Sequence, residues 1–295
     1  MKPLFKFFLL FIGIVLLSAF LAPVLFDFLP FKFEKIFNRL VMIFSVAAAI
    51  FFVRIRRQTL VNYGLLGKSG SLSLLLVSLA SGAAILFLWD GLKIAFGTAV
   101  WAPAGLGPGM WAVEIIKALS AALIIGFIEE FFFRGVIFYS LNQKMALNRF
   151  ASIMVTSLFY SLAHFVDYKS PFIGPDPTFF DSLRLIAAPL ESLRHFKEIA
   201  PEILGLFIFG MILNGVLLTT GSLYGPIGLH AGCVFFLKLD GLFINFLSPK
   251  NIFWGSSKGY DGILSWILFG SFYFLFQWIS KKPHSTRKGA VPRSV

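Results

Sequence analysis

The chain has 295 residues, of which 58% are hydrophobic and only 14% are charged, and its mean hydropathy is +0.84. Soluble domains are about 45–50% apolar and about 25% charged. The composition therefore excludes a soluble enzyme, a disordered chain and a nucleic-acid-binding domain. The net charge of +12 concerns membrane topology instead, because Lys and Arg in short loops orient membrane helices. We expect an integral protein of the lipid bilayer with no nucleic-acid partner.

The N-terminal part of the chain holds three apolar runs that predict membrane-spanning helices. The first, residues 7–26, is longer than the core of a signal peptide, so we interpret it as a retained helix. The second, residues 40–53, is short, but the arginines that flank it can extend their side chains to the interface. The third, residues 69–89, has the full length of a span.

Five further apolar runs complete the pattern. They cover residues 111–142, 150–166, 203–220, a run from 224 that ends before Pro249, and 263–279. Backbone exposed to lipid must satisfy its hydrogen bonds internally, and the alternating pattern of a membrane β-barrel is absent. The sequence therefore predicts an all-α fold, a polytopic transmembrane helical bundle of about eight spans.

The longest polar segment, residues 167–202, has apolar side chains at helical spacing with charges between them. This pattern predicts one or two helices in the membrane interface, bent at Pro189, which either pack against the bundle or gate the substrate. Eight spans place both termini on one side, and that side collects the Lys and Arg of the N-terminal end, of two loops and of the tail 281–295. We expect cytoplasmic termini in the plasma (inner) membrane of a prokaryote.

The fourth span carries three charges where the bilayer makes charge costly. Glu129, Glu130 and Arg134 lie within six residues, and each charge near the bilayer centre costs about 2.5–3.5 kcal/mol on insertion scales. Residues four apart share a helix face, so Arg134 can pair with Glu130, or reach Glu129. A glutamate in such a place is suited to act as a general base on water. A structural ion pair between helices is the alternative.

Two histidines, His164 and His230, lie in other apolar segments. Glu129 and His164 are about fifteen and sixteen residues from the turn between their helices, which places both roughly 23 Å from it. His230 closely follows the stretch 221–226, which must therefore dip into the protein. We expect a site buried between spans four, five and seven.

These residues resemble a known family. Glu-Glu-x-x-x-Arg at 129–134, Ser-Leu-Ala-His at 161–164 and Gly-Ser-Leu-Tyr-Gly-Pro-Ile-Gly-Leu-His-Ala at 221–231 are similar to the motifs of CPBP intramembrane endopeptidases. This is the CAAX protease and bacteriocin-processing group, also called the abortive-infection family, which includes the Ras-converting prenyl protease. The resemblance implies a CPBP-like catalytic core over 118–247, with the interfacial insertion 167–202. N-terminal helices would occupy 1–117, a last span 248–280 and a basic tail 281–295.

The resemblance also implies roles for the residues. Glu129 would activate the attacking water with the help of His164, and Glu130 and Arg134 would hold that arrangement. His230 would help to bind the oxyanion. The substrate would be a membrane-anchored protein or peptide. The family is described both as glutamate-dependent and as metal-dependent. We expect no cofactor, with zinc at Glu129, His164 and His230 as the alternative.

Two positions depart from the family pattern. The residue four after the third-motif histidine is usually Asn and supplies an oxyanion donor, whereas here it is Val234. The residue four before His164 is usually Phe and here is Tyr160. Asn214 is our first candidate for a substitute donor, ahead of Lys238. A catalytically inactive relative acting as an immunity or chaperone-like membrane protein is the alternative function. A transporter is a third, against which the absence of an internal repeat counts.

Overall fold

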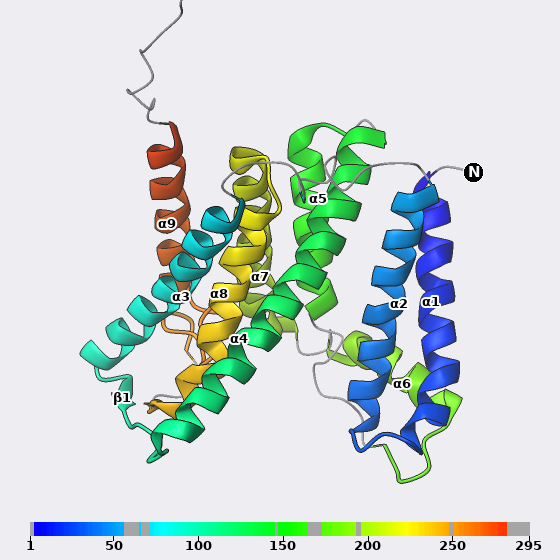
Figure 1. Ribbon diagram of the computed structural model, residues 1–295, viewed down its shortest axis with the longest axis horizontal. Coiled ribbons are helices and arrows are strands. Elements are labelled where there is room, and N and C mark those ends of the chain that lie inside the picture. The colour runs from blue at the N-terminus through cyan, green and yellow to red at the C-terminus, as the bar shows by residue number, and fades with distance from the viewer. Residues whose placement is uncertain are drawn as a thin grey trace, which may run out of the picture.

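The computed structural model describes residues 3–55, 65, 71–144, 147–164, 173–192, 196–247 and 251–281. The basic tail beyond Lys281 lies outside these residues, as do 165–172 and 193–195 of the expected interfacial segment. Within the described part the chain is almost entirely helical. The N-terminal end of the first helix and the C-terminal end of the last one lie on the same side of the molecule (Figure 1).

The helices follow the expected order of apolar segments. They are α1 (Pro3–Phe26), α2 (Phe33–Ile55), α3 (Ser71–Ala95), α4 (Pro108–Glu130), α5 (Arg149–Ala163), α6 (Phe179–Ser192), α7 (Phe196–Thr220), α8 (Tyr224–Leu239) and α9 (Ile263–Lys281). The helix of α4 continues as two π-helical segments, η2 (Phe131–Phe138) and η3 (Ser140–Lys144), and a short 3₁₀ turn, η6 (Asp240–Leu242), follows α8.

Four helical stretches in the described residues are long and apolar enough to cross a membrane. They are α1, α3, α7 and the continuous helix 108–142, while α5 and α9 are apolar but shorter. The protein is therefore an integral membrane protein. The count of eight spans stays a prediction for α2, α5, α8 and α9.

Some helices extend past the charges at which the expected spans stop. α2 begins at Phe33 rather than at residue 40, and α3 continues through Asp90 and Lys93. α7 begins at Phe196, so residues 196–202 of the expected insertion belong to this helix. Charged residues thus lie within these helices without ending them, and one of them, Lys93, bonds to the carbonyl of Ser256.

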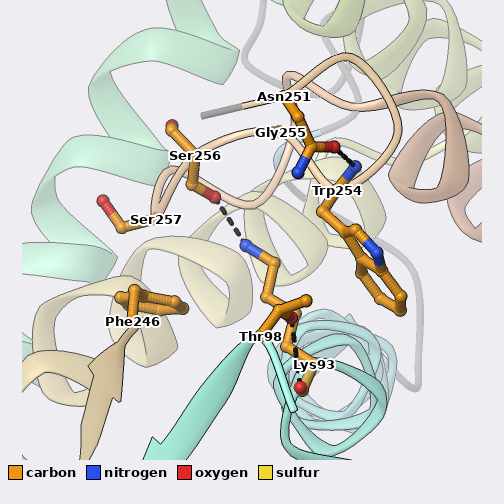
Figure 2. A pocket seen from close by; sticks show the side chains of 8 residues that line it. All are labelled: Lys93, Thr98, Phe246, Asn251, Trp254, Gly255, Ser256 and Ser257. Atoms are coloured by element: carbon orange, nitrogen blue, oxygen red, sulfur yellow. Dashed lines mark hydrogen bonds between the residues drawn. The ribbon is translucent and has the colours of Figure 1, made fainter. Parts of the chain in front are cut away.

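A small antiparallel ribbon is the exception in the otherwise helical fold that the sequence predicts. β1 (Ala99–Trp101) pairs with β2 (Ile244–Phe246), with Val100 opposite Asn245. The ribbon joins the end of α3 to the segment after α8. Beside it, Lys93 Nζ donates a 2.6 Å hydrogen bond to the carbonyl of Ser256. Figure 2 shows the shallow pocket around this contact, which residues 251–257 help to line. The buried lysine thus ties the loop before α9 to α3.

The centre of the bundle is α7. In its most apolar stretch of 18 residues 50% of the residues are buried, compared with 22% in α3 and 17% in α1. Its inner face packs in the main hydrophobic cluster, which includes Leu206, Phe209 and Leu213. α5 contacts α7 through buried hydroxyls, and Ser161 donates to the carbonyl of Ile203 at 2.7 Å. Small and hydroxyl-bearing side chains let membrane helices approach and hydrogen-bond one another.

Glycines set the close contact between α3 and α8. A Cβ at Gly82 would overlap the carbonyl oxygen of Leu229, and a Cβ at Gly232 would overlap the carbonyl oxygen of Leu79. Backbones this close are typical of helix pairs in membranes, where small residues permit tight packing. The close contact between α3 and α8 fixes the position of α8, the helix that carries His230.

The N-terminal helices form a separate cluster with α6. Leu185 of α6 is buried against α1 and α2 together with Phe37, and Ser182 Oγ donates to the carbonyl of Ala19 at 3.1 Å. α6 continues as a helix through Pro189, where a bend is expected. The described part of the interfacial segment therefore packs against the bundle, as one of the two expected alternatives requires.

Candidate active site

The two adjacent glutamates at the end of α4 have different surroundings. Glu130 and Arg134 are almost fully buried, with 0% and 1% of their surface exposed. Arg134 Nη1 donates to Glu130 Oε1 at 3.1 Å, and Nη2 donates to the carbonyl of Gly210 on α7 at 3.2 Å. Arg134 lies in the π-helical segment η2, whose wider turn brings residues four to five apart nearly above one another. Of the two expected partners, Arg134 therefore pairs with Glu130.

His230 joins the same buried group from α8. Its Nδ1 lies 2.9 Å from Glu130 Oε1, the oxygen that Arg134 also contacts. The stretch before α8 does enter the protein, because Ser222 and Leu223 are 4% and 0% exposed. Glu130, Arg134 and His230 form one sealed cluster.

Glu129 faces a different histidine. Nε2 of His164 lies 3.4 Å from Glu129 Oε2, and the two side chains are 29% and 23% exposed. His164 caps the C-terminal end of α5, and its Nδ1 lies 2.9 Å from the carbonyl oxygen of Tyr160. The sequence predicts that Glu129 and His164 lie at the same distance from the turn between their helices. In the structure the two side chains lie at the same level, in contact with one another. Unlike the sealed cluster, this pair is open to its surroundings.

Several buried polar atoms on the helices of this region have no hydrogen-bond partner among the described residues. They are Glu129 Oε2, Glu130 Oε2, Arg134 Nε, Thr156 Oγ1 and Asn214 Oδ1. Native proteins leave few such atoms unpaired, and each one calls for a water, a ligand or another explanation. Three of these atoms belong to Glu129, Glu130 and Arg134, so the candidate site keeps polar atoms that a water or a ligand can satisfy.

Asn214 is fully buried on α7, and its Nδ2 donates to Ser157 Oγ at 3.1 Å. Its amide hydrogens are thus directed toward α5 in this structure. Lys238 is exposed. Val234 follows His230 by four residues on α8 and offers no polar atom. Asn214 as oxyanion support stays a prediction.

The sequence marks Tyr160 as a departure from the family pattern, but it does not predict where the side chain lies in the candidate site. Its ring lies 4.4 Å from Arg134 Cζ, and its centroid lies 4.4 Å from that of His164 and 6.1 Å from that of His230. Tyr160 thus connects the sealed cluster to the open pair. Its spacing from His164, one helical turn, was the available signal.

The zinc alternative requires three side chains to share one ion. Among the residues described, no three His, Cys, Asp or Glu side chains gather closely enough to do so. Both histidines do have Nδ1 engaged and Nε2 unengaged by a hydrogen bond, an orientation that metal ligands also use. The donor set is therefore incomplete in this arrangement, although the orientation of the rings is compatible with a ligand role.

The fold and these contacts define a membrane protein with a polar Glu–His site between its helices. Residues 111–236 match a protein-family model described as "Rce1-like: Type II CAAX prenyl endopeptidase Rce1-like". The matched segment runs from α4 to α8 and includes both glutamates, Arg134 and both histidines. This segment is therefore similar to the CAAX-type proteases of the CPBP family, which confirms the resemblance found in the sequence. No curated protein and no solved structure matches the chain significantly.

Proposed function

We propose that the protein is an intramembrane endopeptidase that hydrolyses a peptide bond in a membrane-anchored protein or peptide, with a water activated by Glu129. The catalytic core of this proposal is 118–247, and both termini are cytoplasmic. The family name indicates CAAX prenyl peptides as the first substrates to test.

The observation that carries the proposal is the contact between Glu129 and His164. Nδ1 of His164 must donate its hydrogen, because its partner is a carbonyl oxygen. In the neutral histidine Nε2 is then an acceptor, and it faces the carboxylate of Glu129 at 3.4 Å. Two acceptors facing one another repel unless a hydrogen lies between them. A water that donates one hydrogen to each would satisfy both and keep a lone pair directed outward for attack.

The chemical steps follow from this placement. Glu129 takes one proton from the water while the water oxygen forms a bond to the scissile carbonyl carbon, and the carbonyl electron pair moves onto oxygen. When the tetrahedral intermediate collapses, the C–N bond breaks and Glu129 returns its proton to the leaving nitrogen. The products are a carboxylic acid and an amine, so one water is consumed for each bond cleaved.

The sealed cluster has a positioning role in this proposal. Glu130 is engaged by Arg134 and His230 through the same oxygen, and it is fully buried. It therefore holds the two elements that carry Arg134 and His230, rather than meeting the substrate. His230 presents Nε2 to the substrate side as oxyanion support, with Asn214 as a candidate second donor.

Glu129→Gln is the direct test, because it keeps the shape of the side chain and removes the base. We expect cleavage of an internally quenched CAAX peptide, farnesylated or not, to fall at least 10²-fold, as loss of a general base does, with an unchanged melting temperature in detergent. Glu114→Gln is the matched control, since Glu114 lies on α4 in an exposed pair with Lys117. Wild-type rates for Glu129→Gln would contradict the assignment of the base.

We also propose that the reaction needs no metal. The guanidinium of Arg134 lies beside Glu130 within the same region and would repel a divalent cation. Activity should survive dialysis against EDTA and 1,10-phenanthroline. Loss of activity with either chelator, restored specifically by Zn²⁺, would establish the zinc alternative at Glu129, His164 and His230 instead.

Val234 favours the second candidate, an inactive relative that acts as an immunity or chaperone-like membrane protein. Such a protein would keep Glu130, Arg134 and His230 for stability and would cleave no peptide. A wild-type protein that binds the farnesylated peptide without cleaving it would support this alternative.

A further inference from the structure

Tyr160 occupies the centre of the candidate active site, and the steps above do not use it. The residue is 1% exposed. Its ring contacts Phe133 edge-on at 5.1 Å between centroids and lies 4.4 Å from Arg134 Cζ. It also contacts the ring of His164, at 4.4 Å between centroids and with the two ring planes tilted by 56°. The ring is therefore held by these contacts, and its hydroxyl has little freedom to move.

The hydroxyl of Tyr160 has no partner within the part of the chain that the structure describes. The contacts of the residue are those of its ring and of its backbone carbonyl, which His164 contacts at 2.9 Å. Buried tyrosine hydroxyls usually find a hydrogen-bond partner. The ring lies 4.4 Å from Arg134 Cζ, and its centroid lies 4.4 Å from that of His164. The residue therefore stands beside the histidine that would help to hold the water.

A second oxyanion donor is missing at the position of the family asparagine, because Val234 has no polar side-chain atom one turn after His230. Nδ2 of Asn214 donates to Ser157 Oγ, which engages one of its two amide hydrogens. A phenol hydroxyl is a neutral donor and needs no change of protonation to bind a developing negative charge.

We propose that the hydroxyl of Tyr160 donates a hydrogen bond to the oxyanion of the tetrahedral intermediate. This inference rests on the proposed function, because it assigns a catalytic contact within that reaction. Tyr160 transfers no proton in this step, so the balance of atoms given above is unchanged. The donor acts when the carbonyl oxygen becomes negative, and it should therefore affect the transition state more than substrate binding.

Tyr160→Phe tests the proposal because it removes one oxygen and keeps the ring. We expect kcat for the farnesylated CAAX peptide to fall by about 10²–10³, the usual effect of losing one oxyanion donor, with KM within about threefold. A phosphinate analogue of the same peptide, whose tetrahedral oxygen copies the oxyanion, should lose affinity by a similar factor. Tyr273→Phe is the matched control, because the hydroxyl of Tyr273 on α9 is bonded to Gln277 at 2.8 Å.

The outcomes separate this inference from the function on which it rests. A kcat for Tyr160→Phe within threefold of wild type, while Glu129→Gln is inactive, would overturn the role of Tyr160 alone. A reduced kcat with unchanged phosphinate affinity would also overturn it, since the hydroxyl would then act on packing or on Glu129. A melting temperature equal to wild type excludes loss of fold as the cause. A wild-type protein that cleaves neither peptide contradicts the proposed function and this inference together.

Discussion

Nδ1 of His230 lies 2.9 Å from Oε1 of Glu130, in a cluster where neither side chain is more than 4% exposed. The same oxygen accepts from Arg134 at 3.1 Å. This arrangement separates two glutamates that are neighbours in sequence. Consecutive residues on a helix point about 100° apart, so Glu130 turns inward to the sealed cluster and Glu129 turns to the open pair with His164. Helix geometry thus places adjacent residues of the same type in two different environments, one sealed and one partly exposed.

Replacing Arg134 should damage the fold as well as activity. Arg134→Leu leaves the buried carboxylate of Glu130 without its cation, and breaking a buried pair in this way costs about 3–5 kcal/mol. Thermal unfolding in detergent should show a clearly lower midpoint. Arg184→Leu is the matched control, because its pair with Asp181 has a 70% exposed arginine and surface pairs contribute only about 0–1 kcal/mol. Equal midpoints for both variants would mean that Arg134 does not stabilise the site.

The close contact of α3 with α8 predicts opposite effects for two glycines of the same helix. Gly82→Ala would push its Cβ into the carbonyl oxygen of Leu229, and overpacking of this kind costs about 1–3 kcal/mol. Gly91→Ala meets no atom within 4 Å and should be neutral or should stabilise the helix by up to about 1 kcal/mol. Unfolding in a graded series of denaturing detergent measures both. A neutral Gly82→Ala would contradict the tight contact.

The motifs predicted the residues of the candidate site but not how they pair, and apolar length predicted where the helices lie. Those signals are local, since they depend on spacing along one helix and on the distance from a turn. What they missed depends on contacts between distant segments. Asp90 ends an apolar run in the sequence, but α3 continues to Ala95, and its Lys93 bonds to Ser256, 163 residues away. The ribbon of β1 and β2 similarly joins segments that no local pattern connects.

The sequence also could not predict that Glu129 and Glu130 have different partners. Both are one helical turn or a little more from Arg134, and helical spacing alone left either pairing open. The π-helical segment η2 changes that spacing, and its formation depends on packing rather than on residue type. The position of Tyr160 was hidden for a related reason. Its spacing from His164 was visible in the sequence, but its contact with Arg134 exists only because α5 and η2 lie side by side.

The last prediction concerns Val234, which stands where the family pattern has an asparagine. It also tests the proposed role of Tyr160 as an oxyanion donor. Val234 lies one turn after His230 on α8, so an amide at this position would reach the same side of the site. Val234→Asn should raise kcat if the protein is a protease that has one oxyanion donor fewer than its relatives. The gain should be larger in the Tyr160→Phe background than in the wild type, because an added donor contributes most where the first has been removed.

A double-mutant cycle with the farnesylated peptide measures this coupling. Donors that act on the same oxyanion should give non-additive changes in kcat, whereas residues that act independently give the same factor in both backgrounds. Val234→Leu is the matched control, since it keeps the position apolar. Equal gains in the two backgrounds would mean that Tyr160 and residue 234 do not share the oxyanion. No gain in either background, from a protein that also fails to cleave the peptide as wild type, would favour the inactive relative, because restoring a donor cannot help a site that has lost its reaction.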